Sequence, residues 1–223
     1  MLPQAVLLDM DGTLTDTEKL WFQAEIEVIG ELGGDWKAGD ELNLIGLNLH
    51  DSSRLLIDTL ELDISPEDLG RVLTDRVAEL GRRHGMPWRP GALELLYRLR
   101  DLEIPSVLVT ASMRRFAQLT LDQAPEGTLE FSVTGEDVTR GKPDPEAYVH
   151  AAEGVGAAPE LCVAFEDSVP GLHSALGAGA ITYGVPLKVD LSGVHGAQLI
   201  DSLEQVDEEF LRSAISSRYQ RPL

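Results

Sequence analysis

Residues 5–13 read AVLLDMDGT, an apolar run followed at once by two aspartates and a glycine. Its first four residues are apolar without interruption, a pattern typical of a strand that is buried on both faces of a parallel sheet. The run stops at Asp9, and Gly12 allows a tight turn soon after it. Because ligands of open parallel sheets bind at the carboxyl ends of the strands, Asp9 and Asp11 stand where a ligand is expected.

Later parts of the chain repeat this pattern. Four further short apolar runs read as strands, at residues 104–109, 129–133, 161–165 and 180–185. Stretches of helical period lie between them, such as the one that contains Leu93, Leu96 and Leu99. Strands that alternate with helices predict parallel pairing and a three-layer α/β sandwich.

Residues 16–88 interrupt this alternation, because they show helical periodicity and no convincing strand. One helix is expected from Leu20 to Leu32, where Gly33 stops it, and a second over residues 52–60. A third begins after Ser65, with Pro66 in its first turn and an acid three residues after Ser65. The sequence therefore predicts a core domain of residues 1–15 and 89–223, with a helical domain of residues 16–88 inserted into it.

Composition and charge exclude several classes of protein. The chain carries 38 acidic and 18 basic residues, a formal net charge of −20, and 43% of its residues are hydrophobic. This charge opposes nucleic acid and anionic membranes as partners. No apolar run approaches the roughly 20 residues that a membrane span needs, and the first residues lack a signal-peptide pattern. With Cys162 as the single cysteine, we expect a cytoplasmic protein. As a separate expectation, the chain is a monomer or a weak homo-oligomer.

Three other polar segments also follow or flank predicted strands. Thr110-Ala111-Ser112 ends the second predicted strand and is expected to open a helix, Lys142 lies in a Gly/Pro-rich loop, and Glu166-Asp167 ends the fourth predicted strand. Taken singly, each is explained as a helix cap or a solvated lysine. Taken together with Asp9 and Asp11, they predict one site at the carboxyl edge of the sheet.

In their order and strand context, these residues resemble the four motifs of the haloacid dehalogenase superfamily of aspartate-dependent phosphotransferases. The resemblance spans nearly the whole chain and implies a Rossmann-like core with a helical cap. It implies that Asp9 is the nucleophile, that Asp11 is the general acid and base, and that Lys142 supplies fixed positive charge. The phosphoryl group would bind at Thr110, Ala111 and Ser112. The residues implied for Mg²⁺ are Asp9, Asp11, Glu166 and Asp167.

The chemistry explains why a phosphoryl-transfer site needs cations. Two unit negative charges 4 Å apart repel by about 4 kcal/mol at an effective dielectric near 20, so an aspartate nucleophile and a phosphate need a cation between them. Oxygen ligands suit Mg²⁺. Carbon–halide displacement needs no general acid, so the presence of Asp11 favours phosphate-ester chemistry over dehalogenation.

The helical insert resembles the cap of the subfamily that holds beta-phosphoglucomutase and small sugar phosphatases. Glu18 would face the substrate as the cap begins, although an acid in the first turn of a helix is an equally good interpretation. Residues 44–52 resemble the substrate loop of that cap. Leu49 stands where the mutase has an arginine and Trp21 where it has a histidine, which counts against a mutase. Asn48 stands where related sugar phosphatases usually carry an arginine.

The sequence thus predicts a Mg²⁺-dependent phosphatase that hydrolyses a small phosphorylated metabolite, such as a sugar phosphate, through an aspartyl-phosphate. The alternative that stays open is a phosphosugar mutase of the beta-phosphoglucomutase type. A signalling receiver domain also combines acids, Thr and Lys around a phosphorylated Asp. A receiver, however, carries its acceptor Asp after a middle strand and has no helical insert after the first, so the arrangement argues against it.

Overall fold

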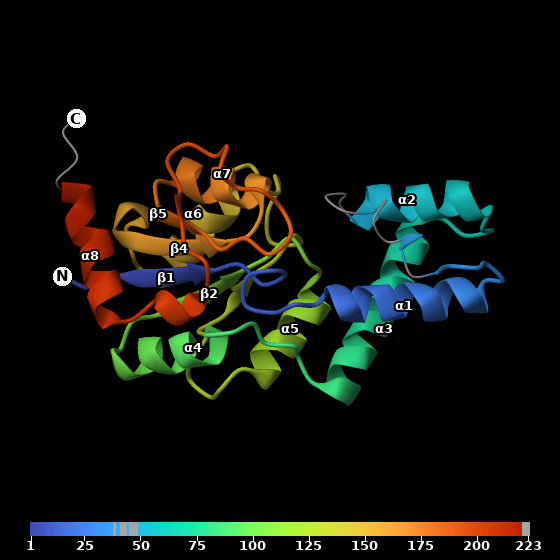
Figure 1. Cartoon of the computed structure of the whole chain (residues 1–223), viewed down its shortest axis with the longest axis horizontal. Coiled ribbons are helices and arrows are strands. Elements are labelled where there is room, and N and C mark those ends of the chain that lie inside the picture. The colour runs from blue at the N-terminus through green and yellow to red at the C-terminus, as the bar shows by residue number, and fades with distance from the viewer. Residues whose placement is uncertain (38, 41–43, 45–48, 220–223) are drawn as a thin grey trace. The chain divides into compact units, whose positions relative to one another are not determined.

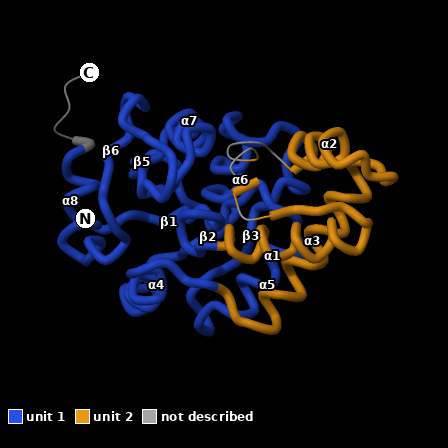
Figure 2. Tube along the Cα trace, turned by 45° about the vertical axis from the view of Figure 1, so that its right-hand side comes forward, with its two compact units in different colours: residues 1–16, 87–223 blue, residues 17–86 orange. Residues whose placement is uncertain are grey.

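The computed structural model describes residues 1–37, 39–40, 44 and 49–219. The chain forms two compact units, one of residues 1–16 and 87–223 and one of residues 17–86 (Figure 2). The first unit is discontinuous in sequence, since the second unit lies between its two segments.

A six-stranded parallel sheet forms the centre of the first unit, in the order β3-β2-β1-β4-β5-β6. The strands are β1 (Ala5–Leu8), β2 (Ser106–Val109), β3 (Ser132–Val133), β4 (Cys162–Glu166), β5 (Ile181–Gly184) and β6 (Gln198–Leu199). Every residue of β1, β2, β4 and β5 is buried, as expected for predominantly apolar strands at the centre of a parallel sheet. The predicted α/β class is confirmed, and the short, exposed β6 is an addition to the prediction.

Helices cover both faces of this sheet. They are α4 (Ala92–Asp101), α5 (Arg114–Gln123), α6 (Glu146–Gly154), α7 (Val169–Ala178) and α8 (Glu208–Tyr219), with 3₁₀ turns at Pro159–Leu161 and Leu203–Gln205. In Figure 1, α6 and α7 lie above the sheet and α4 and α5 below it. Alternate residues of the central strands, such as Leu7 and Ala164, pack with Tyr148 of α6 in one buried cluster. Burial of each large apolar side chain contributes about 1.5–3 kcal/mol.

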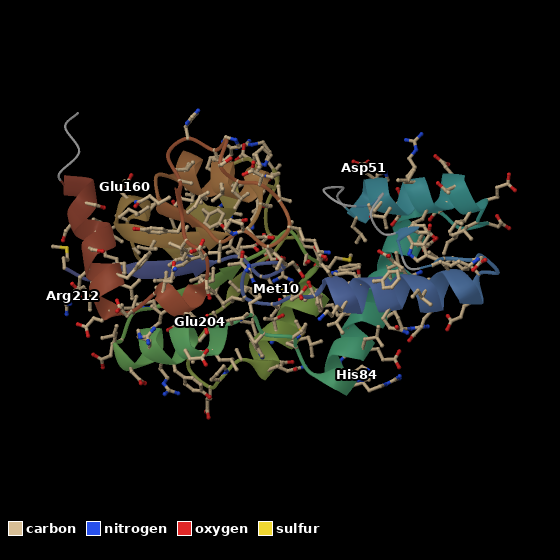
Figure 3. The ribbon with its side chains drawn as sticks, viewed as in Figure 1. Met10, Asp51, His84, Glu160, Glu204 and Arg212 are labelled. Carbon is tan, nitrogen blue, oxygen red and sulfur yellow. The ribbon has the colours of Figure 1, made fainter. Side chains whose placement is uncertain are left out.

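Polar and apolar side chains of the first unit separate as expected for a globular domain. Glu160, Glu204 and Arg212 lie on its outside, whereas Met10 is fully buried (Figure 3). The thioether of Met10 accepts a hydrogen bond from the Thr120 hydroxyl at 3.1 Å. Met10 therefore anchors the start of the loop after β1 in the core, between the two aspartates that flank it.

Among the described residues of the second unit, three α-helices form: α1 (Glu18–Glu31), α2 (Leu49–Leu60) and α3 (Pro66–His84). Both α1 and α2 pack against α3. The Ser65 hydroxyl accepts a hydrogen bond from the Asp68 backbone N–H at 3.1 Å, which confirms the predicted N-cap. The second helix starts at Leu49 rather than at the predicted residue 52. None of the described helices is long and apolar enough to cross a membrane.

Candidate active site

The loop after β1 folds back on itself and brings its acids to the edge of the sheet. The backbone N–H groups of Leu14 and Thr15 both donate to the Met10 carbonyl, and the N–H of Gly12 donates to the Thr15 carbonyl at 2.8 Å. Gly12 has a φ of +86°, and a Cβ there would overlap the carboxylate of Asp167. A glycine is therefore needed at this position both for the turn and for the close approach of the two loops.

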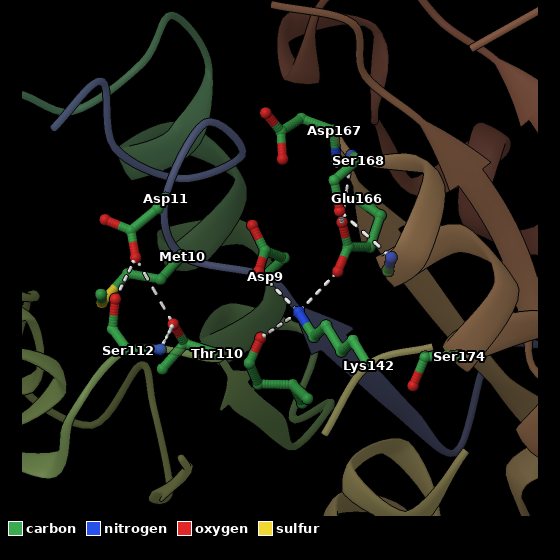
Figure 4. A network of polar contacts seen from close by, with 12 residues as sticks. Asp9, Met10, Asp11, Thr110, Ser112, Lys142, Glu166, Asp167, Ser168 and Ser174 are labelled. Carbon is green, nitrogen blue, oxygen red and sulfur yellow. Dashed lines mark hydrogen bonds and ion pairs between the residues drawn. The ribbon is translucent and has the colours of Figure 1, made fainter. Parts of the chain in front are cut away.

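Lys142 lies at the centre of a buried polar cluster. Its ammonium donates to Asp9 Oδ1 at 2.7 Å, to Glu166 Oε1 at 2.5 Å and to the Val109 carbonyl at 2.9 Å (Figure 4). Lysine has three N–H donors, so all of them are used. The side chains of Lys142 and Asp9 are each 9% exposed and that of Glu166 is fully buried. The ammonium is therefore held in one position, in contact with the ends of β1, β2 and β4.

Glu166 is bound on both of its oxygens. In addition to Lys142, Oε1 accepts the Tyr148 hydroxyl at 3.0 Å, and Oε2 accepts the Ser168 hydroxyl at 3.0 Å. The backbone N–H groups of Asp167 and Ser168 donate to Oε2 as well, each at 3.2 Å. A Cβ on Gly171 would overlap this carboxylate. Glu166 is thus arranged to hold Lys142 in place.

Sequence reasoning missed Tyr148 and Ser168 as members of this cluster. Tyr148 lies on the apolar face of α6 and is fully buried. The Lys142 ammonium lies over its ring, 5.3 Å from the ring centroid. One signal was available, because a buried tyrosine hydroxyl usually requires a hydrogen-bond partner. Ser168 caps α7, where its hydroxyl accepts the Gly171 N–H at 3.1 Å. Its second contact, to Glu166, depends on the folded loop.

Charges in the cluster shift one another's ionisation. Burial, and next the charge of Glu166, raise the pKa of Asp9 to about 7. Burial and the charge of Asp9 raise the pKa of Asp167 to about 8. Burial alone would lower the pKa of Lys142, but the charges of Asp9 and Glu166 raise it above its ordinary value. The cluster therefore holds more negative charge than one ammonium balances, which favours an additional cation.

The donor atoms at this place fit a hard divalent cation. One carboxylate oxygen each from Asp9, Glu166 and Asp167 lie within 4.8 Å of one another. Asp9 Oδ2 is buried and has no hydrogen-bond partner among the described residues. Oxygen-only donors are the set that Mg²⁺ prefers. Because both Glu166 oxygens already accept hydrogen bonds, Asp9 and Asp167 are the carboxylates best able to bind such an ion.

Asp11 lies in a different environment from Asp9. Its Oδ2 accepts the Ser112 hydroxyl at 2.7 Å and the Thr110 hydroxyl at 3.4 Å (Figure 4). The Thr110 hydroxyl also accepts the N–H of Ser112 at 2.9 Å. The prediction that residues 110–112 open a helix is wrong by two residues, because α5 begins at Arg114. The hydroxyls orient Asp11, and the exposed Ala111 lies between them.

The structure thus brings together the predicted site residues of the first unit. Asp9, Lys142, Glu166 and Asp167 share one cluster, and Asp11 lies beside it with Thr110 and Ser112. Glu18 is the first residue of α1 in the second unit, and its substrate contact stays a prediction. Of the predicted substrate loop, residues 45–48, with Asn48 among them, lie outside the described residues.

Comparisons with known proteins agree on one family. A family model described as haloacid dehalogenase-like hydrolase matches residues 3–179. The chain is 32% identical over 180 residues to the phosphorylated carbohydrates phosphatase of Thermotoga maritima, covering 79% of this chain and 82% of that one. It is 36% identical over 129 residues to hexitol phosphatase A of Escherichia coli, covering 57% and 60%. A crystal structure of CbbY from Rhodobacter sphaeroides with xylulose-(1,5)-bisphosphate superposes with a TM-score of 0.80 at 25% identity, covering 92% and 96%.

Proposed function

The chain belongs to the haloacid dehalogenase-like hydrolases, and from this membership we propose that it hydrolyses a small phosphomonoester with Asp9 as the nucleophile. The membership confirms the resemblance drawn from the four motifs, and the relatives named as phosphatases support phosphatase activity. Their names also support a phosphorylated sugar or polyol as the substrate class. The observation that carries the proposal is the Lys142 ammonium, held between Asp9 and Glu166, while Asp9 Oδ2 finds no hydrogen-bond partner in the part of the chain that the structure describes.

In the first step, a carboxylate oxygen of Asp9 attacks phosphorus and the bond to the ester oxygen breaks, which gives an aspartyl-phosphate and an alkoxide. Asp11 donates its proton to the departing alkoxide. Lys142 keeps positive charge beside the reacting carboxylate. Its three hydrogen bonds prevent it from swinging away, so little reorganisation is needed during the reaction.

In the second step, water attacks the aspartyl-phosphate and inorganic phosphate leaves. Asp11, now ionised, removes the proton of this water, which returns both aspartates to their starting state. The hydroxyls of Ser112 and Thr110 hold the Asp11 carboxylate in a defined position for both transfers. We propose that Thr110, Ala111 and Ser112 line the phosphoryl position as well.

We propose that Mg²⁺ binds at Asp9 and Asp167, with the backbone carbonyl of Asp11 as a further ligand, while the nearby Glu166 adds negative charge beside the site and holds Lys142. Bound there, Mg²⁺ would supply positive charge against the phosphate oxygens and keep Asp9 ionised. The need for such a cation follows from Asp9 itself, whose pKa is raised to about 7 by burial and by Glu166 in the absence of any ion. A nucleophile with this pKa is only partly ionised at neutral pH.

Asp9→Asn provides the decisive experiment. We expect kcat for para-nitrophenyl phosphate to fall at least about 10⁴-fold, because an amide cannot form the phosphorylated intermediate. Asp122→Asn, an exposed aspartate of α5, serves as the matched control and should keep full activity. Activity that persists in purified Asp9→Asn would exclude the mechanism.

Two further measurements define the reaction. Asp11→Asn should slow release of phosphate from Asp9, so that rapid quenching and mass spectrometry of the peptide that contains Asp9 show one added phosphoryl group. A panel of phosphorylated sugars and polyols, assayed for phosphate release with Mg²⁺, identifies the substrate. If the protein isomerises beta-glucose 1-phosphate in the presence of a bisphosphate primer, without net release of phosphate, it is a phosphosugar mutase and the phosphatase proposal is wrong.

For location, we propose the cytoplasm. The single cysteine, Cys162, is buried and free, and burial raises its pKa to about 11, so it is held as an unreactive thiol. Such a chain needs no oxidising compartment to fold.

A further inference from the structure

Arg89 connects two loops at the catalytic edge of the sheet. It stands at the start of the second segment of the first unit, where its backbone N–H donates to the Leu14 carbonyl at 2.8 Å. Its guanidinium is partly buried and donates to the Gly12 carbonyl in the loop after β1. The same group donates to the carbonyls of Val185 and Pro186, after β5, at 3.1 and 3.2 Å.

The sheet order shows what this connection spans. β1 and β5 are the two neighbours of β4, so they lie on either side of it. Adjacent strands are about 4.8 Å apart, which places the ends of β1 and β5 roughly 10 Å from each other. Arg89 bridges that distance with one side chain, next to the position where Asp167 follows β4. The N–H of Val185 also donates to the Glu166 carbonyl at 2.7 Å, which fixes the far side of the bridge to β4.

The bonds of Arg89 bear directly on the proposed cation ligands. Gly12 follows Asp11 and packs so closely on Asp167 that no Cβ fits between them. A shift of the Gly12 carbonyl would therefore move the loop that carries Asp9 and Asp11 relative to Asp167. Arg89 also interacts electrostatically with Asp167 and Asp16. It is thus a cation near the site whose hydrogen bonds go to backbone carbonyls.

We propose that Arg89 is a positioning residue: it holds the loop after β1 against the loop after β5 and thereby fixes the spacing of Asp9 and Asp167 for a divalent cation. This inference rests on the proposed function, in which these two aspartates bind Mg²⁺. Arg89 acts through the two loops and makes no contact with phosphate in this role. Loss of groups that orient metal ligands typically weakens metal binding about 10- to 100-fold.

The test measures Mg²⁺ binding to the purified full chain by calorimetry, and half-saturating Mg²⁺ and kcat with para-nitrophenyl phosphate. Arg89→Met removes both charge and hydrogen bonds at similar volume. We expect its Kd for Mg²⁺ to rise about 10- to 100-fold, with kcat falling and KM for the ester changing by less than about threefold. Arg89→Lys keeps the charge but loses the planar fork, so it should show a smaller rise in the same direction.

A matched control is available on the same unit. Arg98 of α4 is also partly buried and donates to a backbone carbonyl, that of Val206, in a contact distant in sequence from the site loops. Arg98→Met should lower thermal stability without changing the Kd for Mg²⁺. If Arg89 acted through its charge alone, the Kd for Mg²⁺ of Arg89→Met would fall instead of rise, because removing a positive charge strengthens cation binding.

The outcomes separate the two proposals. Wild-type protein that binds no Mg²⁺ would refute the cation site and with it the proposed function. Wild-type protein that binds Mg²⁺, together with an unchanged or tighter Kd in Arg89→Met, would overturn the positioning role alone. If Arg89→Met does not fold, the Kd of Arg89→Lys decides by the same criterion.

Discussion

Two clusters of ion pairs in this chain use the same chemistry and differ in burial. In the first unit, Lys142 pairs with Asp9 and Glu166, and the three side chains are 9%, 9% and 0% exposed. In the second unit, Arg76 of α3 pairs with Glu27 and Glu31 of α1, whose side chains are 31% and 63% exposed. Water screens the second cluster and not the first. The buried cluster therefore holds a fixed geometry, whereas the surface cluster adds modestly to the packing of α1 against α3.

Lys142→Met tests the buried cluster and should have the largest effect on stability among the changes that compare the two clusters. It leaves Asp9 and Glu166 buried without their cation, and breaking a buried pair in this way costs about 3–5 kcal/mol. We expect the free energy of unfolding in urea to fall by that amount, and kcat to fall at least about 10²-fold. A loss of stability below about 1 kcal/mol would show that the cluster is as well screened as the surface one.

The free energy of unfolding should change with pH in opposite directions for the two clusters. Asp9 and Asp167 have native pKa values raised to about 7 and about 8 from an ordinary value of 3.8. Metal-free native protein therefore holds protons that the unfolded chain has released, so the free energy of unfolding falls as pH rises through this window. The pKa of Glu27 is lowered, by its hydrogen bond with Gln23 first and with Arg76 second, so its contribution is lost as pH falls.

The loss of stability of the metal-free protein with rising pH is measured by thermal unfolding with chelator, at about pH 5.5 and about pH 8.5. Added Mg²⁺ competes with the protons on Asp9 and Asp167, so the rise in Tm that it causes should be larger at the higher pH. Asp9→Asn should flatten the slope measured with chelator. A Tm increment from Mg²⁺ that is equal at both pH values would contradict the raised pKa values.

Arg76→Met should change the free energy of unfolding least. The Arg76 guanidinium donates to Glu27 at 2.8 Å and to Glu31 at 2.9 Å, and its side chain is 19% exposed. We expect the free energy of unfolding to fall by about 1 kcal/mol or less, since screened ion pairs contribute little. High salt should shrink this difference and leave that of Lys142→Met largely unchanged. A deficit that persists in high salt would show that packing of the Arg76 stem, and not its charge, matters.

Much of the sheet could be predicted, because buried parallel strands are continuous apolar runs. The runs at residues 5–8 and 161–165 correspond to β1 and β4 within one residue. The run at 104–109 begins too early, because Pro105 has no N–H to donate and β2 starts at Ser106. β6 was missed, since its two exposed residues carry no hydrophobic pattern.

The candidate site was predictable only in part. Asp9, Lys142 and Asp167 could be identified because motif order and strand ends bring such residues to one edge. Tyr148 and Arg89 stand outside the four motifs, so their sequence context did not assign them to this edge; burial of the Tyr148 hydroxyl indicates a partner but not which one. The sequence around Arg89 holds no sign that its guanidinium reaches the loops after β1 and β5.

The two segments of the first unit meet before the second unit begins and after it ends. The Asp16 N–H donates to the Pro87 carbonyl at 2.8 Å, and Thr15 pairs with Trp88 in an antiparallel bridge. The ends of the intervening stretch are therefore fastened together by the sheet domain itself. Because the entropy of closing a loop grows only with the logarithm of its length, inserts of very different size are tolerated at this junction. Evolution can thus exchange what lies between residues 16 and 87 while the catalytic scaffold stays intact.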